Sequence, residues 1–168
     1  ISLMPTNLYG PGDNYSLTDS HVLPALIRKF DEAKKENINN VTCWGTGCPK
    51  REFLHVEDLS KACLYVLENW NPSAKYFPTQ EKNPLSFLNV GSGEEVSIKE
   101  LAELIAKEIG YQGDIKWDNS KPDGTPRKLL NINRIKEIGW EPSITLRDGI
   151  KDTIRQYNNE IKNKTIRI

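Results

Sequence analysis

The sequence predicts an α/β fold whose strands pair in parallel. Two observations support this prediction. Short apolar segments alternate along the 168 residues with longer segments in which apolar residues recur at helical spacing. The chain also shows no internal repeat and no low-complexity tract. Alternation of this kind is typical of units in which a helix carries the chain back to the start of the next parallel strand.

The first third of the chain begins with a predicted strand. Residues 1–5 form an apolar run and are expected to be a buried strand, and the turn-rich segment 6–14 is expected to be a loop. A helix is predicted from 22 to 35, because its apolar residues fall on one face and Pro24 can occupy the first turn. Those apolar residues are Val22, Leu26, Phe30 and Ala33.

The next segment repeats the pattern of strand, loop and helix. Residues 41–44 are predicted to be a short strand, 45–51 a loop and 55–70 a helix. We expect one helix face to carry Leu59, Cys63, Val66 and Leu67. Three prolines and several polar residues then predict a loop from 71 to 84.

The helix predicted from 98 to 109 has the clearest boundaries. It follows a strand that ends in glycines within 85–93, Ser97 is its expected N-cap, and Gly110 is its expected stop. Its apolar positions are 98, 101, 102, 105 and 109. A small strand is predicted from 114 to 117.

The segment "SKPDGTPRKLLN", residues 120–131, fits neither helical spacing nor strand alternation. We therefore expect a stiff loop that carries Asp123, Arg127 and Lys128. A solvated surface loop and a ligand-binding loop both fit this composition. Beyond it we predict a short helix from 132 to 139, a longer one from 146 to 161, and a frayed end.

Composition restricts the class of partner. The 23 basic and 23 acidic residues are interleaved, so nucleic acid is not an expected partner. No apolar stretch reaches the roughly 20 residues needed to cross a bilayer, and no leader is recognisable, which predicts a cytoplasmic protein that does not contact membranes. Cys43, Cys48 and His55 have atom types that bind zinc but lack a recognised spacing, and we predict no metal site.

Two motifs have residues suited to binding a ligand. "TNLYGPG" follows the first strand, where Thr6 and Asn7 offer polar groups and Gly10 lets the main chain approach a ligand. An ordinary turn is the alternative. In "REFLHVEDL", Arg51 is suited to a phosphate, with an ion pair to Glu52 or Glu57 as the alternative, and we interpret His55 as structural.

Taken together, the motifs resemble a known family. "PTNLYGPGDN", "REFLHVEDL", "LNVGSGEEVSIKELAELI" and "IGWEPSITLRDGI" occur in the order and spacing of extended short-chain dehydrogenase/reductases that act on nucleotide sugars. "SHVLPALIRKF", "CWGTGCPKREF" and "SKPDGTPRKLLN" narrow the resemblance to the carboxyl-terminal half of the GDP-L-fucose synthase branch. The resemblance runs from residue 1 to about residue 160.

The resemblance implies the fold and the extent of the protein. It implies the carboxyl-terminal part of an extended Rossmann-type dehydrogenase/reductase, with strands from the parallel sheet and a small α/β substrate-binding domain. Residues 1–168 would be mainly the substrate-binding portion, with the amino-terminal NADP-binding half absent. The apolar start "ISLMP", which lacks an initiator Met, agrees with this expectation. The full-length enzyme is expected to be a homodimer.

The resemblance also implies a reaction and its residues. The family uses NADP(H) to epimerise GDP-4-keto-6-deoxy-D-mannose at C3 and C5 and then to reduce its 4-keto group. The catalytic histidine falls on His21, which also contacts the cofactor. The other expected cofactor-binding residues are Pro5, Thr6, Asn7 and Leu8, and the expected GDP-sugar contacts are Lys29, Trp44, Arg51 and Asp123.

The chemistry of these residues suits the implied roles. Epimerisation beside a ketone passes through an enolate, which needs a proton donor that titrates near neutral pH, and histidine meets that need. Lys29 and Arg51 can neutralise a pyrophosphate, and Trp44 is suited either to stacking or to a core position. Asp123 on a stiff turn can accept hydrogen bonds with little loss of entropy.

Parts of the family's catalytic machinery do not occur in this sequence. A Gly-x-x-Gly-x-x-Gly loop and a Tyr-x-x-x-Lys pair are both missing, and none of the cysteines lies in the family's catalytic context. Two alternatives therefore stay open. One is another NAD(P)-dependent nucleotide-sugar epimerase or dehydratase, and the other is a nucleotide-sugar-binding module without catalysis.

Overall fold

The computed structural model describes residues 1–71 and 87–168, which form eight strands and five helices. In chain order these are β1 (Ser2–Pro5), β2 (Asn7–Tyr9), α1 (Val22–Lys35), β3 (Asn40–Trp44), β4 (Lys50–His55), α2 (Val56–Asn69), β5 (Phe87–Val90), β6 (Glu95–Ser97), α3 (Ile98–Ile109), β7 (Asp114–Asp118), β8 (Arg127–Lys128), α4 (Asn133–Glu137) and α5 (Leu146–Asn163). Apart from residue 71, the loop predicted from 71 to 84 lies outside the described residues.

Parallel pairing dominates the sheets, as the sequence predicts. Strand β1 pairs with β5, β2 with β4, β3 with β7 and β4 with β8, all in parallel, whereas β4 and β6 pair antiparallel. The predicted α/β class is therefore confirmed. Because β4 is the shared neighbour of β2, β6 and β8, it brings segments distant in the sequence onto one strand.

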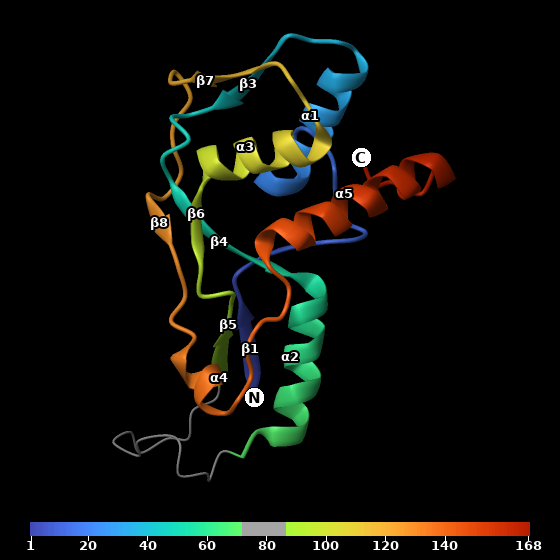
Figure 1. The fold of residues 1–168 in the computed structure, drawn as a ribbon. Coiled ribbons are helices and arrows are strands. Elements are labelled where there is room, and N and C mark those ends of the chain that lie inside the picture. The colour runs from blue at the N-terminus through green and yellow to red at the C-terminus, as the bar shows by residue number, and fades with distance from the viewer. Residues whose placement is uncertain (72–86) are drawn as a thin grey trace.

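The molecule is elongated (Figure 1), and the buried apolar side chains of the described residues form two clusters. Helices α1, α3 and α5 surround one core, while α2, α4 and β5 contribute to the other. Strand β4 runs between them, with Phe53 in the first core and Leu54 in the second. Successive side chains of a strand point to opposite faces, so one strand can serve both cores.

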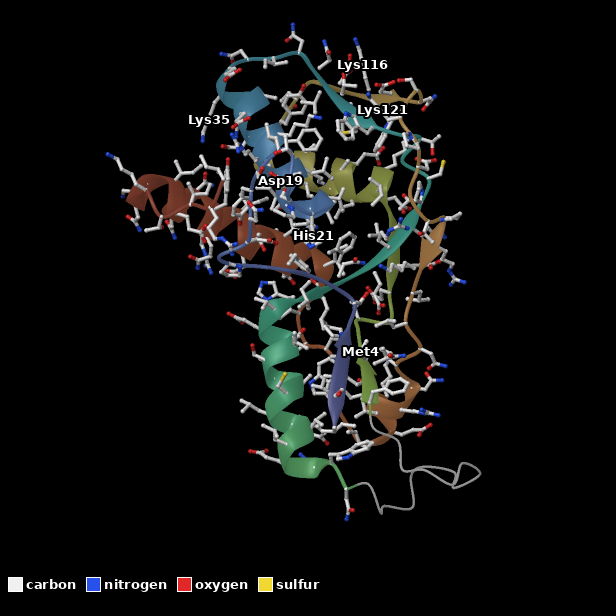
Figure 2. All side chains as sticks on the ribbon, turned by 180° about the vertical axis from the view of Figure 1, so that it is seen from behind. Met4, Asp19, His21, Lys35, Lys116 and Lys121 are labelled. Carbon is white, nitrogen blue, oxygen red and sulfur yellow. The ribbon has the colours of Figure 1, made fainter. Side chains whose placement is uncertain are left out.

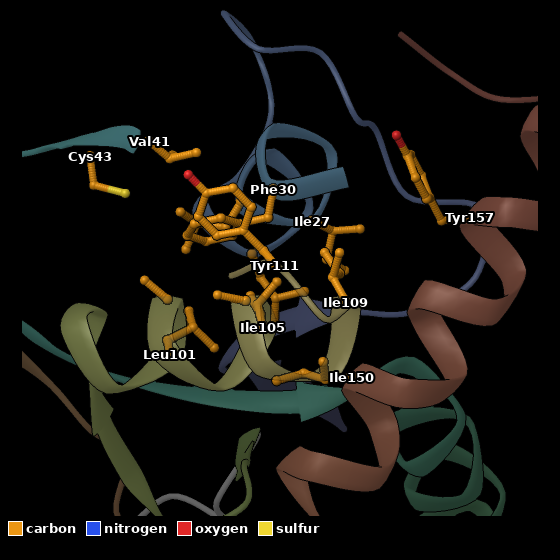
Figure 3. Close-up of a cluster of buried hydrophobic side chains, with 14 of the residues drawn as sticks. Ile27, Phe30, Val41, Cys43, Leu101, Ile105, Ile109, Tyr111, Ile150 and Tyr157 are labelled. Atoms are coloured by element: carbon orange, nitrogen blue, oxygen red, sulfur yellow. The ribbon is translucent and has the colours of Figure 1, made fainter. Parts of the chain in front are cut away.

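The first core explains why α3 is firmly placed (Figure 3). Its residues Leu101 and Ile105 are fully buried together with Phe30 of α1 and Ile150 of α5. Truncation of such a leucine or isoleucine to alanine typically lowers the free energy of unfolding by about 2–5 kcal/mol. Packing of this kind fixes the positions of α1 and α3 relative to each other.

Local signals set the ends of α3 as predicted. The Ser97 hydroxyl accepts a 3.1 Å hydrogen bond from the Glu100 amide, and the Glu100 carboxylate accepts a 2.8 Å hydrogen bond from the Ser97 amide. This reciprocal pair satisfies donors that a helix start leaves free. Gly110 ends the helix in the left-handed conformation, with φ of 77°.

Several local predictions are wrong where pairing with distant strands decides the structure. The segment predicted as the loop 6–14 contains β2, the predicted loop 45–51 already includes the start of β4, and the stiff loop 120–131 includes β8. Each of these strands is completed by a partner remote in sequence. Such pairing leaves little trace in a short segment.

Three further predictions, two about exposure and one about the carboxyl-terminal end, also need correction. Strand β1 is largely exposed, with 52% of Met4 accessible. The buried face of α2 is made by Asp58, Ala62 and Val66, whereas Cys63 and Leu67 are exposed. The expected frayed end is instead tied back, because the Tyr15 amide donates a 2.8 Å hydrogen bond to the Arg167 carbonyl.

Candidate functional site

A cavity of about 440 Å³ forms where β2 leaves the sheet and the chain approaches α1. Its lining includes Thr6, Asn7 and Leu8, which are three of the expected cofactor-binding residues, and also His21. Pro5 lies in β1, paired with Val90, and is not part of the lining. The structure therefore places His21 in the same cavity as Thr6–Leu8, which lie more than ten residues earlier in the chain.

Hydrogen bonds to β4 hold one wall of this cavity. The Asn7 side-chain amide donates to the Glu52 carbonyl at 2.7 Å, and the Thr6 hydroxyl donates to the same carbonyl at 3.3 Å. The Thr6 amide donates to the Val90 carbonyl at 3.0 Å. These polar groups serve to fix the wall, while Leu8 supplies an apolar surface to the lining.

His21 occupies the N-cap position of α1 but makes no capping hydrogen bond with its side chain. It is exposed, and Figure 2 shows it near the middle of the long axis of the molecule. Asp13 lines the same cavity. Burial raises the pKa of the Asp13 carboxyl, although a backbone hydrogen bond from Asn14 and the charge of His21 oppose that rise. The imidazole is thus available to a ligand and electrostatically linked to a neighbouring acid.

Arg51 lies on β4 beside the loop that carries Asp123. Its neighbour in the parallel β4–β8 pair is Lys128, and its Nη1 donates a 2.7 Å hydrogen bond to the Lys50 carbonyl. A Cβ placed on Gly124 would lie only 3.0 Å from the Arg51 Nη2 atom, so the guanidinium packs against this loop. Among residues 1–71 and 87–168, Arg51 makes no ion pair with Glu52 or Glu57, which was the alternative.

The Asp123 carboxylate is held by Thr46. Its Oδ1 accepts a 2.9 Å hydrogen bond from the Thr46 amide, and its Oδ2 accepts a 2.6 Å hydrogen bond from the Thr46 hydroxyl. These hydrogen bonds, the hydroxyl first, hold the pKa of Asp123 below its usual value. The loop 120–126 is therefore tethered to the loop that follows β3, and its acid is charged and exposed.

Trp44 is the last residue of β3, and Lys29 of α1 lies beside that strand. The Trp44 side chain is 70% exposed, so its alternative role as a core residue is wrong. The Lys121 Nζ atom lies 5.6 Å from the centroid of its ring, within the range of a cation–π contact. The half-buried Lys29 donates a hydrogen bond from Nζ to the Thr42 carbonyl. An exposed indole and a nearby ammonium suit an aromatic base and an anion, respectively.

The expected residues thus form two groups. His21 and Thr6–Leu8 line the cavity, while Trp44, Arg51 and Asp123 gather around the loops after β3 and before β8. Strand β4 links the groups, because it carries Arg51 and accepts the hydrogen bonds of Thr6 and Asn7.

Thr46 and Glu52 were not predicted as site residues from the sequence, but the structure gives each a clear role. Thr46 fixes Asp123, and the flanking glycines in "GTG" are the signal that could have drawn attention to it. Glu52 is fully buried, and its carboxylate accepts hydrogen bonds from the amides of Gly93 at 2.7 Å and Leu130 at 3.0 Å. A buried carboxyl group needs such partners, but nothing local in the sequence identifies them.

The remaining candidate residues are His55 and the three cysteines. His55 is buried, and its Nδ1 atom accepts a 3.3 Å hydrogen bond from the Glu57 amide at the start of α2, in line with a structural role. Cys43 is buried, which raises the pKa of its thiol, whereas Cys48 and Cys63 are exposed. Over the described ranges, no group of three potential ligands is placed to hold a metal ion, and no helix is long and apolar enough to span a bilayer.

Comparison with protein families and solved structures shows what the chain is similar to. Residues 1–76 match the model of the NAD dependent epimerase/dehydratase family. A crystal structure of a GDP-L-fucose synthetase from Naegleria fowleri bound to NADP superposes with a TM-score of 0.82 at 26% identity, covering 99% of this chain and 48% of that chain. The fold is that of Rossmann-type NAD(P)-dependent epimerases and reductases.

Curated relatives give a narrower likeness. The chain is 51% identical over 94% of its length to Probable GDP-L-fucose synthase 1 of Oryza sativa subsp. japonica, and it covers 44% of that protein. It is 46% identical over 93% of its length to GDP-L-fucose synthase of Escherichia coli (strain K12), and it covers 48% of that protein. The predicted resemblance to GDP-L-fucose synthases is confirmed. The chain spans about half the length of these relatives.

Proposed function

We propose that this chain is the carboxyl-terminal, mainly substrate-binding portion of a GDP-L-fucose synthase. That enzyme epimerises GDP-4-keto-6-deoxy-D-mannose at C3 and C5 and reduces the 4-keto group with NADPH. The observation that carries the proposal is the cavity lined by both His21 and the segment Thr6–Leu8, because it brings an imidazole next to the expected cofactor-binding residues. Similarity to the curated relatives supports the same conclusion.

His21 has the properties that epimerisation requires. The proton lost from the carbon beside the ketone must be replaced on the opposite face, and an imidazole can donate it near neutral pH. The exposed His21 side chain is not used to cap α1. In this proposal it gives a proton to the enolate carbon and recovers one from solvent.

The cavity residues fit the nicotinamide side of NADP(H). The lining combines the apolar Leu8 with polar groups already tied to β4, so it is rigid before a ligand arrives. When bound, the cofactor supplies the hydride for reduction of the 4-keto group. In this proposal Thr6, Asn7, Leu8 and His21 orient it, and Pro5 supports the strand beneath them.

The second group of residues suits the GDP-sugar. Arg51 is free of ion pairs with Glu52 and Glu57 among the described residues and can bind a phosphate through two donors. Lys29 adds a second positive charge, and the exposed Trp44 offers a ring face. Asp123 supplies a charged acceptor for a hydroxyl or an amino group.

This proposal assigns the remaining chemistry to another part of the polypeptide. The sequence has no Gly-x-x-Gly-x-x-Gly loop and no Tyr-x-x-x-Lys pair. A general acid for the ketone and a loop for the cofactor phosphates must then come from an amino-terminal half. We further propose that the complete enzyme is a cytoplasmic homodimer.

The test uses the full-length polypeptide that contains these residues. Purified protein is mixed with NADPH and GDP-4-keto-6-deoxy-D-mannose, and the product is identified by NMR. We expect NADPH oxidation and formation of GDP-L-fucose. The same 4-keto sugar linked to UDP or dTDP serves as a control for the nucleotide. Absence of turnover with the GDP-sugar, or formation of a reduced sugar without inversion at C3 and C5, would contradict the proposal.

A further inference from the structure

We infer that Thr46 is a positioning residue that holds the Asp123 carboxylate in the orientation needed to bind the GDP-sugar. This inference rests on the proposed function, because it assumes that Asp123 contacts the substrate. Thr46 itself need not touch the ligand. Its contribution is to remove the rotational freedom of an acid on an exposed loop.

The hydrogen bonds to Asp123 use both carboxylate oxygens. The Thr46 amide donates to Oδ1 at 2.9 Å and the hydroxyl donates to Oδ2 at 2.6 Å. Two bonds from one residue fix the carboxylate plane as well as its position, which a single bond cannot do. The acid is therefore oriented before any substrate binds.

The direction of the Thr46 hydroxyl is also set. Its oxygen accepts a 3.1 Å hydrogen bond from the Cys48 amide, so one lone pair is occupied by that donor. A hydroxyl has one hydrogen to donate, and that hydrogen is directed to Asp123. Serine keeps this arrangement, whereas valine keeps the approximate shape but loses both the donor to Asp123 and the acceptor for the Cys48 amide.

Gly45 lets the carboxylate approach this closely. A Cβ at position 45 would lie 2.3 Å from the Asp123 Oδ1 atom, and the backbone there has φ of 77°. The Gly45 amide in turn donates a 3.0 Å hydrogen bond to the Asp118 carbonyl. The two loops are thus joined through both the main chain and the Asp123 side chain.

The anchored carboxylate can still bind a ligand. An ionised carboxylate offers about four acceptor positions, and Thr46 occupies two of them. Trp44 lies two residues before Thr46 in the chain, and the Arg51 guanidinium packs against Gly124, the neighbour of Asp123. Orientation before binding lowers the entropy lost on binding.

The test is a double-mutant cycle in the full-length enzyme, with Thr46→Val, Asp123→Ala and the double variant, and with Thr46→Ser as the conservative control. We expect Thr46→Val to raise KM for the GDP-sugar by about 3- to 10-fold, as for one lost hydrogen bond. The NADPH KM should not change. Thr46→Ser should stay within about twofold of wild type, and the double variant should be no weaker than Asp123→Ala alone.

The cycle separates failure of this inference from failure of the proposed function. If Asp123→Ala leaves the KM for the GDP-sugar at the wild-type level, the proposed substrate contact of Asp123 is wrong and the inference falls with it. If Asp123→Ala weakens the GDP-sugar but Thr46→Val does not, or if the two effects add, only the inference is overturned. Thr46→Ala provides the same reading should the valine variant fold poorly.

Discussion

The Asn7 side-chain amide lies 2.7 Å from the Glu52 carbonyl oxygen, and this hydrogen bond fastens the wall of the His21 cavity to strand β4. The residue before Glu52 is Arg51, the proposed phosphate ligand. The Glu52 carboxylate extends the connection, because it also accepts hydrogen bonds from Gly93 and Leu130. One buried residue thus fixes the spacing between the proposed proton donor and the proposed GDP-sugar contacts.

Glu52→Gln should lower the stability of the protein. The Glu52 carboxylate accepts hydrogen bonds from the backbone N–H groups of Gly93 and Leu130. Glutamine has only one acceptor oxygen, so its side-chain NH2 group would face one of these two donors. We expect the free energy of unfolding in urea to fall by about 1–3 kcal/mol, the range for an unsatisfied buried group. Glu103→Gln, on the exposed side of α3, is the matched control and should be nearly neutral. Equal effects of the two substitutions would contradict the role of Glu52.

Asp58 should make stability depend on pH in the acid range. Burial disfavours its charged form, but hydrogen bonds from the Ser143 side chain and from the Ile144 and Ser143 amides lower its pKa overall. The stabilisation from a lowered pKa is fully present above the unfolded value of about 4 and is lost as pH falls through the folded pKa. Unfolding in urea measured between neutral and acid pH should show this loss. Asp58→Asn should be less stable at neutral pH and flatter with pH, and an unchanged pH profile would contradict the assignment.

Gly45→Ala should be more damaging than Gly12→Ala. Both glycines have φ of 77°, so alanine is strained at either position, by roughly 1–2 kcal/mol. At Gly45 the added Cβ also meets the Asp123 carboxylate, whereas at Gly12 no atom lies within 4 Å of it. Thermal unfolding of the two variants isolates the collision. Equal losses in Tm would show that the Asp123 loop moves aside freely.

His21→Gln should block epimerisation more than binding. Glutamine keeps a polar side chain in the cavity but cannot donate a proton to an enolate carbon. In the full-length enzyme we expect exchange of the C3 and C5 protons with solvent deuterium to fall by about 100-fold or more, the usual contribution of general acid–base catalysis. KM for the GDP-sugar should change little. Exchange at the wild-type rate would show that His21 is structural.

Local signals in the sequence explain which parts of the fold could be predicted. The ends of α3 are set by Ser97 and Gly110, which act within one turn, and both predictions are confirmed. Strand β8 could not be predicted, because two residues become a strand only by pairing with Lys50 and Arg51. Pairing between distant segments overrides local composition in such cases.

The same contrast between local signals and distant contacts applies to the candidate site. The candidate residues come from motifs and from the family resemblance, and one cavity is lined by Thr6, Asn7, Leu8 and His21. The partner of Asp123 was not readable, because Thr46 lies 77 positions earlier in the chain. The burial of Glu52 was likewise hidden, since charged residues are buried only where the fold provides partners.

Binding of the GDP-sugar by this half of the enzyme is the central proposal. Arg51→Ala in the full-length enzyme tests it, with Lys151→Ala on the exposed side of α5 as the control for loss of one positive charge. Loss of a charged hydrogen bond to phosphate should raise KM for the GDP-sugar by about 10- to 100-fold and should reduce its dependence on salt. The control should leave both constants unchanged.

The decisive measurement is therefore the ratio of the two Michaelis constants in Arg51→Ala. We predict that KM for the GDP-sugar rises while KM for NADPH stays at the wild-type value. A parallel rise in both constants, or no change in either, would contradict the proposal that Arg51 and its neighbouring loop form the GDP-sugar site.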